Sequence, residues 1–271
     1  MQCLTCLRVA YVCCVMAGIR PPFRPPILNI RRLAKSTRDS IGKCPDKTIS
    51  QIGKGFSTPA NGRLLNPAIL RAVASTRMYL LFRELSFIGV IQPALGEVEF
   101  FYSRQRSVEY DLLSMPFNMP PPALTSIQEA VRLGLMIFGF AASTRFVPMS
   151  AYTLFLVHKL KETLELVDLG SLWSSDLLLW LLFFGAHISR HLEERTWFIA
   201  CLARNTTQLD LTSADAAQEV LLKFFYLERF SRDSLLEIWD EISSFRQASS
   251  TEDLQSHATT GFVDLMEIDH Q

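Results

Sequence analysis

The sequence DLLLWLLFFGAHISR, residues 176–190, contains an unbroken apolar run over residues 177–186 and charged side chains only near its ends. A helix of this composition is apolar on every face, so it is stable only where other elements cover it on all sides. The run is too short to cross a bilayer, which takes about 20 apolar residues. Ser174 and Ser175 stand where a helix start needs a capping hydroxyl. The stretch therefore predicts a buried central helix.

Helix-start signals recur on both sides of this stretch. Asn66 followed by Pro67 is typical of a first helical turn, and the apolar spacing after them predicts a helix to about residue 90. Ser126 with Glu129 has capping-box spacing and predicts a helix over residues 127–146. The remaining helices are predicted over residues 97–115, 152–169, 193–203, 214–229 and 235–245.

Prolines are expected to separate some of these helices. Pro116 and the Pro120-Pro121-Pro122 run should end the helix over residues 97–115, because proline has no amide hydrogen to donate along the helix. No segment alternates apolar and polar residues between hairpin turns, as a strand would. We therefore predict an all-α fold, an irregular domain of about eight helices.

Charge and composition divide the 271 residues into three parts. Residues 1–63 hold eleven Lys and Arg residues against two Asp, a net charge of +9 that leaves −9 for the remainder. They are also rich in Pro and Gly, and we interpret the Gly53-Lys54-Gly55 sequence as linker. We predict a flexible basic arm over 1–63, the helical domain over 64–247 and a short disordered acidic tail over 248–271. Such an arm binds phosphates weakly and without sequence preference.

The common catalytic motifs are absent from the sequence. It has no Gly-x-Ser-x-Gly elbow, no Walker loop, no Gly-x-Gly-x-x-Gly before a helix and no His-Glu-x-x-His. His187 and His191 have a spacing that suits metal ligands, yet two ligands are too few for a site. We therefore expect no enzyme activity, no metal and no other cofactor.

Two segments of the second half form a recognisable pattern: LLLWLLFFGA over residues 177–186 and EERTWF over 193–198. Together they resemble the segment LLW-x-L-x-x-GA … E-R-x-WF of the fungus-specific transcription factor regulatory domain, the helical C-terminal region of fungal zinc-cluster regulators. Further pieces of that pattern occur in the same order at residues 129–133, 145–148, 160, 221–226 and 236–241. The similarity covers roughly residues 64–245.

The motif residues have a structural interpretation of their own. Large aromatic side chains bring apolar area to helix contacts, and a Gly-Ala pair lets another helix approach closely. We expect these residues to lie in the core: Trp180, Gly185, Ala186, Trp197, Phe198 and Trp239. What the resemblance implies is a nuclear transcription regulator that acts through contacts with protein partners of the transcription machinery.

The N-terminus reproduces part of the zinc cluster that family members often carry. Cys3, Cys6 and Cys13 have the C-x2-C-x6-C spacing of the first half of that cluster, but only Cys44 could serve the second half. The residues between these cysteines are apolar, whereas the DNA-binding module of the family is basic. We interpret the three cysteines as a remnant and expect no sequence-specific DNA binding.

The tail ends in an alternation of apolar and acidic residues. Phe262, Leu265, Met266 and Ile268 would form one stripe of a short helix if a partner supplied a groove. Such composition is typical of activation segments, so we predict that this segment contacts the transcription machinery. The alternative is that the same helix packs against the body of the protein.

A second class of function follows from residues 9–19. This apolar run, with Arg8 before it, could anchor a membrane-associated or secreted helical protein, with the basic residues after it resting on anionic lipid. A membrane association is the less favoured alternative, because Arg8 does not form a basic head and the cleavage signature is poor.

Overall fold

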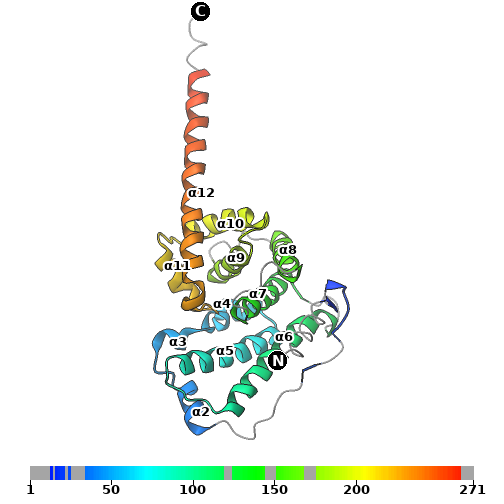
Figure 1. Ribbon diagram of the computed structural model, residues 1–271. Helices are drawn as coiled ribbons and strands as arrows, with labels where there is room; N and C mark the ends of the chain where they lie inside the picture. The colour runs from blue at the N-terminus through cyan, green and yellow to red at the C-terminus, as the bar shows by residue number, and fades with distance from the viewer. Residues whose placement is uncertain are drawn as a thin grey trace, which may run out of the picture.

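Helix α9 (Asp176–Ile188) lies at the centre of the molecule, as the computed structural model in Figure 1 shows. The structure describes residues 13–14, 16–21, 24–25, 34–118, 124–143, 151–167 and 175–263, with side chains up to residue 248. Within these residues all regular structure is helical and no strand occurs, which confirms the all-α prediction. Beyond residue 64 the helices are α5 (Pro67–Phe87), α6 (Leu95–Asn118), α7 (Ser126–Ser143), α8 (Ala151–Glu165), α9, α10 (Glu194–Gln208), α11 (Ala214–Leu221) and α12 (Glu228–Val263).

The central position of α9 follows from its composition. All residues from 177 to 186 are buried, and the helix contacts α7, α8, α10, α11 and α12. Its first turn is capped by Ser175, whose hydroxyl accepts a hydrogen bond from the amide of Leu177 at 3.2 Å. An all-apolar helix is thus covered on every side, as the sequence predicts.

Helices α5 and α6 form an antiparallel pair beneath this centre (Figure 1). The predicted cap of α5 is confirmed, since the Asn66 side chain accepts a hydrogen bond from the amide of Ile69 at 2.9 Å and Pro67 is the first helical residue. Against α5 pack three short elements of the N-terminal region, α2 (Lys35–Gly42), α3 (Lys47–Gln51) and the 3-10 helix η1 (Lys54–Ser57). Helix α4 (Pro59–Leu64) connects η1 to α5.

The prediction of a flexible arm up to residue 63 is therefore wrong for residues 34–63. These residues form α2, α3, η1 and α4, and their apolar side chains enter the same core as α9. Phe56 is fully buried, with its ring edge-on to Trp180 at a centroid distance of 4.9 Å. The domain begins well before residue 64.

The Gly53-Lys54-Gly55 sequence belongs to this packed region and is not a linker. The amide of Gly53 donates to the carbonyl of Phe224 at 3.1 Å, and that of Gly55 donates to Lys223 at 2.7 Å. A Cβ on Gly55 would lie 2.8 Å from the ring of Phe224, closer than real side chains approach. Glycine is needed there because backbone and ring are in direct contact.

Pro116 does not end α6, which continues to Asn118. Proline cannot donate to the carbonyl four residues earlier, so the carbonyl of Leu112 loses its helical partner. The guanidinium of Arg132 replaces it, with Nη1 donating to that carbonyl at 2.9 Å. A tertiary hydrogen bond thus lets the helix pass through the proline.

Other helix boundaries also differ from the sequence prediction, among them the end of α10 at Gln208 and the start of α12 at Glu228. Helix α7 is capped by Thr125 and Gln128, whose side chains each accept from the other's amide, rather than by Ser126 and Glu129. The helix predicted over residues 214–229 is interrupted after Leu221. The buried residues 224–227 lie between α11 and α12, where the carbonyls of Lys223 and Phe224 accept hydrogen bonds from Gly55 and Gly53.

Helix α12 projects from the body and continues far beyond its contacts (Figure 1). Its backbone is helical to Val263, so the prediction of disorder over residues 248–260 is wrong. No proline interrupts this segment, and it extends a helix already fixed by the buried residues Leu235, Ile238 and Ile242. Residues 264–271, with Leu265, Met266 and Ile268, lie outside the described residues, as does the side chain of Phe262.

Candidate functional site

Trp180 occupies the middle of the core. It is fully buried, and its indole Nε1 donates to the carbonyl of Phe225 at 3.2 Å. Its ring meets Phe56, Phe184 and Phe224. The indole therefore joins α9 to the N-terminal region and to the chain between α11 and α12, and it has no exposed surface for a ligand.

Gly185 and Ala186 form the contact between α9 and α10. Both are buried, and the ring of Phe198 from α10 lies directly against Gly185. The core assignment of these three motif residues agrees with the structure. Their role is close packing of two helices, which a larger residue at Gly185 would prevent.

Trp197 and Trp239 are only half-buried, so the expectation that every motif aromatic lies fully in the core is wrong for these two. Trp197 packs edge-on against Phe198 at a centroid distance of 5.0 Å. The guanidinium of Arg246 lies over the ring of Trp239 at 5.7 Å. Each tryptophan thus has one face in the core and one towards the surface of the α10–α12 pair.

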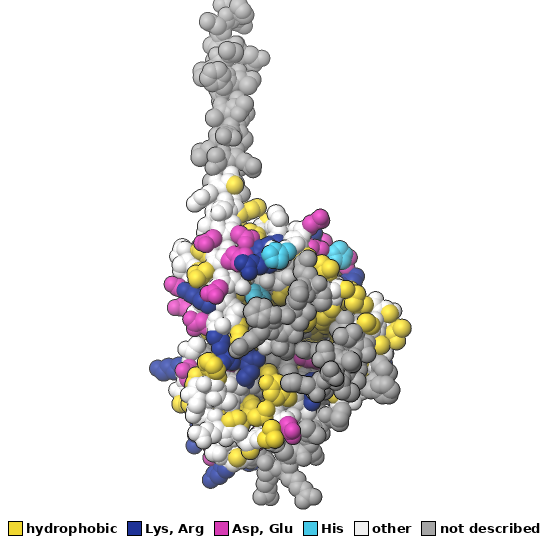
Figure 2. All heavy atoms as spheres, viewed as in Figure 1, with side chains coloured by type: hydrophobic (Ala, Val, Ile, Leu, Met, Phe, Trp, Pro, Cys, Tyr) yellow, Lys and Arg dark blue, Asp and Glu magenta, His cyan; other side chains and the backbone are white. Residues whose placement is uncertain are grey.

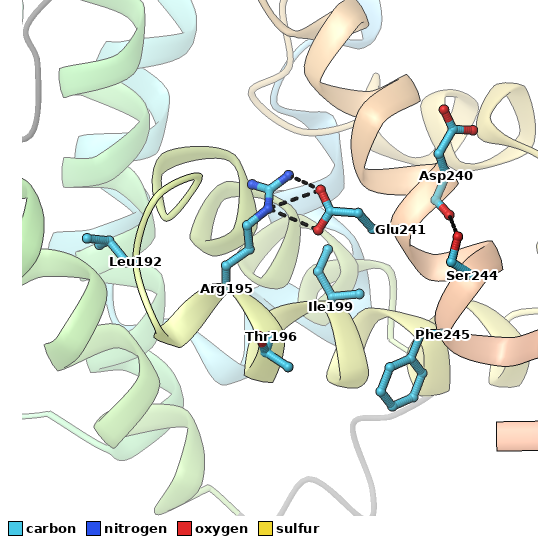
Figure 3. A pocket seen from close by; sticks show the side chains of 8 residues that line it. All are labelled: Leu192, Arg195, Thr196, Ile199, Asp240, Glu241, Ser244 and Phe245. Atoms are coloured by element: carbon cyan, nitrogen blue, oxygen red, sulfur yellow. Dashed lines mark hydrogen bonds and ion pairs between the residues drawn. The ribbon is translucent and has the colours of Figure 1, made fainter. Parts of the chain in front are cut away.

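A groove lies between α10 and α12 and encloses about 510 Å³ (Figure 3). We call it the α10–α12 groove. Its apolar lining comes from Leu192, Ile199 and Phe245, and its polar lining comes from Arg195, Thr196, Asp240, Glu241 and Ser244. Phe245 is 38% exposed although it is aromatic. The groove is open to solvent and combines apolar side chains with the carboxylates of Asp240 and Glu241.

Arg195 joins the two walls of the groove (Figure 3). Its guanidinium donates to both carboxylate oxygens of Glu241, through Nε at 3.0 and 3.1 Å and through Nη2, and it contacts Glu237 at 3.3 Å. Nη1 donates to the carbonyl of Ala186 at the end of α9, at 2.7 Å. Arginine forms such two-pronged pairs with fixed geometry, so this residue sets the spacing of the groove.

Acidic and basic side chains are interspersed on the surface over α11 and α12 (Figure 2). Asp233 and Asp240 are exposed and form no ion pair within the described residues, whereas Glu237 is neutralised by Arg190 at 2.8 Å. Asp240 is thus a carboxylate of the groove lining that has no ion pair within the described residues.

The groove unites two segments of the sequence pattern, residues 193–198 and 236–241. Comparison with family models, with curated proteins and with solved structures finds no match to this chain. The pairing of Arg195 with Glu241 was not predicted. The spacing of Glu237 and Glu241, four residues apart on one face of a helix, was the available signal, but which arginine faces them depends on how α10 and α12 pack.

The cysteines form no metal site in the described part of the chain. Cys3 and Cys6 lie outside it, Cys13 is exposed, and no group of three or more metal-binding side chains occurs among the described residues. Cys201 is half-buried, and burial raises the pKa of its thiol to about 11. At neutral pH this thiol is therefore protonated and a poor nucleophile.

The three histidines whose side chains are described have different surroundings. His158 is exposed beside Glu162 at 3.0 Å, and His191 is exposed. His187 is half-buried with its Nδ1 fully enclosed and without a hydrogen-bond partner. Burial, with a smaller contribution from Arg195 and Arg190, lowers the pKa of His187 to about 4. The ring is neutral at physiological pH and packs on Phe183.

The basic residues of α2 to α4 remain on the surface although this region is folded. All six are exposed: Lys35, Arg38, Lys43, Lys47, Lys54 and Arg63. Contact with phosphate groups would therefore involve a folded surface as well as the preceding arm. No helix among the described residues is long and apolar enough to cross a bilayer, and residues 9–12 and 15 of the alternative anchor lie outside them.

Proposed function

We propose that this chain is a transcription-regulator-like protein that acts through protein–protein contacts, without its own sequence-specific DNA-binding module. The resemblance of residues 177–186 and 193–198 to a transcription factor regulatory domain suggests this class of function. The observation that carries the proposal is the α10–α12 groove, which is open to solvent and is lined by both apolar and acidic side chains. It offers a surface for a protein segment but no group arranged for catalysis.

The partner that fits this groove is an amphipathic helix with apolar side chains flanked by Lys or Arg. Leu192, Ile199 and Phe245 would receive the apolar side chains. The unpaired carboxylate of Asp240 points away from the Arg195–Glu241 pair and would meet a basic residue at the edge (Figure 3). Charge complementarity of this kind fixes the orientation of a bound segment and speeds its association.

A reporter assay tests both parts of the proposal. The full chain is fused to a heterologous DNA-binding domain, and reporter output is compared with that of the DNA-binding domain alone. We expect the fusion to change the output, and we expect Phe245→Glu or Asp240→Lys to remove that change. No effect of the fused chain would contradict the transcriptional role.

Helix α12 supplies matched controls. Leu236 and Asp233 are exposed on the same helix but do not line the groove, so Leu236→Glu and Asp233→Lys introduce the same kinds of change elsewhere. Protein abundance and melting temperature are measured for all four variants. If groove and control variants have equal effects, the groove is not the contact surface.

The proposed activation segment is tested separately in the same assay. Phe262→Ala combined with Leu265→Ala changes the tail and leaves the groove intact. A loss of reporter output would assign activity to the tail. Unchanged output would remove the tail from the proposal.

A nuclear location is part of the proposal. Arg31, Arg32 and Lys35 form a basic cluster suited to nuclear import, and Lys35 is exposed at the start of α2. A tagged chain should enter the nucleus, and replacement of the three residues by Ala should prevent this. Pelleting with membranes in high salt would support the alternative anchor at residues 9–19.

A further inference from the structure

Two neighbouring residues of α6, Tyr110 and Asp111, hold the N-terminal arm. The Tyr110 hydroxyl donates to the carbonyl of Pro21 at 3.2 Å, and the Asp111 carboxylate pairs with the guanidinium of Arg24 at 2.8 Å. Pro21 and Pro25 are buried, whereas Arg24 is exposed. The described part of the arm therefore contacts α6 through a hydrogen bond and an ion pair.

A second contact fixes the direction of the chain. The buried carboxylate of Glu97 accepts hydrogen bonds from the amide of Ala34 at 3.0 Å and from that of Ala94 at 3.1 Å. Glu97 and Asp111 are about four turns apart on α6. Pro21, which comes first in the chain, contacts Tyr110 in the second half of α6, whereas Ala34 contacts Glu97 near the start of α6. The two contacts therefore follow one another in opposite directions along the arm and along α6.

The chemistry of α6 at this point complements a particular kind of segment. Proline has no amide hydrogen, so a proline-rich segment offers carbonyl acceptors and rings, and its extended backbone loses little entropy on binding. Tyr110 supplies a donor and Asp111 an acceptor for arginine. Burial raises the pKa of the Asp111 carboxyl, and Arg24 and Arg71 act in the opposite direction. The half-buried carboxylate thus favours a cation beside it.

We propose that Tyr110 and Asp111 form a peptide-binding site on α6 for an arginine-containing, proline-rich segment, and that Pro21, Arg24 and Pro25 of this chain are its exchangeable occupant. The pattern that the site recognises is Pro-x-x-Arg-Pro, as in Pro21, Arg24 and Pro25. The ion pair is half-exposed, and exposed pairs hold weakly, so the arm can leave and return. This inference is independent of the function proposed for the α10–α12 groove.

Proteolysis of the full chain measures the occupancy of this site. Both Arg20 and Arg24 precede proline, so the informative cut is that of chymotrypsin after Phe23. The cleavage rate at this bond is followed by mass spectrometry and divided by the rate for a free peptide of the same sequence. Tyr110→Phe and Asp111→Asn should each raise the normalised rate about three- to tenfold, as expected for one lost hydrogen bond or ion pair.

A competing peptide tests exchange. A synthetic peptide of residues 18–27 should raise the cleavage rate of the full chain until it saturates, at millimolar concentrations because a tethered arm has a high local concentration. A scrambled peptide of the same composition should have no effect. If the native peptide does not accelerate cleavage of the full chain although the Tyr110→Phe substitution does, the proposal is overturned.

A charge exchange between residues 24 and 111 distinguishes loss of the ion pair from misfolding of the variants. Arg24→Glu and Asp111→Arg should each raise the normalised rate, and the double variant should restore protection, which a merely unfolded chain could not do. If the double variant is cleaved as fast as either single variant, the site does not recognise the arm through this pair.

Discussion

The ring of Phe198 fills the space that a side chain on Gly185 would need. Three atoms of the ring lie within 2.6 Å of the position that a Cβ would occupy, so the two helices α9 and α10 can approach only because residue 185 has no side chain. This contact explains why a glycine is tolerated inside the last turn of an apolar helix, although glycine in a helix costs about 1 kcal/mol relative to alanine.

We expect Gly185→Ala to lower the free energy of unfolding by about 1–3 kcal/mol, because the added methyl group must push α10 away. Gly139→Ala is the matched control, since a Cβ there would meet nothing closer than Gln105 Nε2 at 4.0 Å. The control should be neutral or stabilising by up to about 1 kcal/mol. Chemical denaturation of both variants measures the difference, and equal stabilities would contradict the close contact.

The N-terminal region is predicted to be essential to the core. Phe56→Ala removes a fully buried ring from beneath Trp180 and should cost about 3–5 kcal/mol. Leu166→Ala, at a position 78% exposed, should change stability by less than about 0.5 kcal/mol. Thermal melting of the two variants gives the comparison. If the Phe56→Ala variant has the same melting temperature as the Leu166→Ala control, the interpretation of residues 34–63 as a flexible arm would be restored.

The bond from Arg132 to Leu112 predicts a coupling with Pro116. Arg132→Met should cost about 2–4 kcal/mol, because it leaves the carbonyl of Leu112 and the carboxylate of Glu129 without their partner. In a Pro116→Ala background the new amide can donate to Leu112, so the same change should cost about 1 kcal/mol less. A double-mutant cycle measures this difference, and strictly additive effects would show that the proline is irrelevant to Arg132.

His187 predicts a loss of stability in acid. Its pKa is about 4 in the folded chain and about 6.5 when unfolded, so the unfolded state binds more protons between these values. Stability is therefore full above pH 6.5 and decreases as the pH falls towards 4, by up to about 3 kcal/mol. His187→Gln should flatten this part of the profile, while His191→Gln, at an exposed position, should leave it unchanged. A His187→Gln profile that matches the parent would assign the acid sensitivity to other groups.

Local signals predicted the parts of the fold that depend on local physics. The apolar run of α9 and the Asn66-Pro67 start of α5 were readable because burial on all sides and capping are properties of a few neighbouring residues. The packing of residues 34–63 could not be predicted from the sequence, because their helices span only one or two turns and show no periodic spacing of apolar residues. Phe56 is buried by Trp180 and Phe224, which lie far away in the sequence.

The same limit applies to the functional surfaces. The aromatic motif residues were found in the sequence, and Trp180 and Phe198 lie in the core as expected. The clamp of Arg195 on Glu241 joins residues 46 apart, and the pair of Arg24 with Asp111 joins residues 87 apart. Charge patterns identify such groups as candidates, but only the packing of α6, α10 and α12 selects the partners.

The hydrogen bond from Gly53 to Phe224 has a consequence for synthesis of the chain. The two residues are separated by 171 positions, which a ribosome adds in roughly 9–34 seconds at 5–20 residues per second. During that time Phe56 has been made, but Phe224 and Phe225, whose rings its own ring meets, have not. Phe56 thus lacks these contacts until residues 224–225 emerge, and apolar surface that stays uncovered during synthesis is the kind that chaperones protect from aggregation.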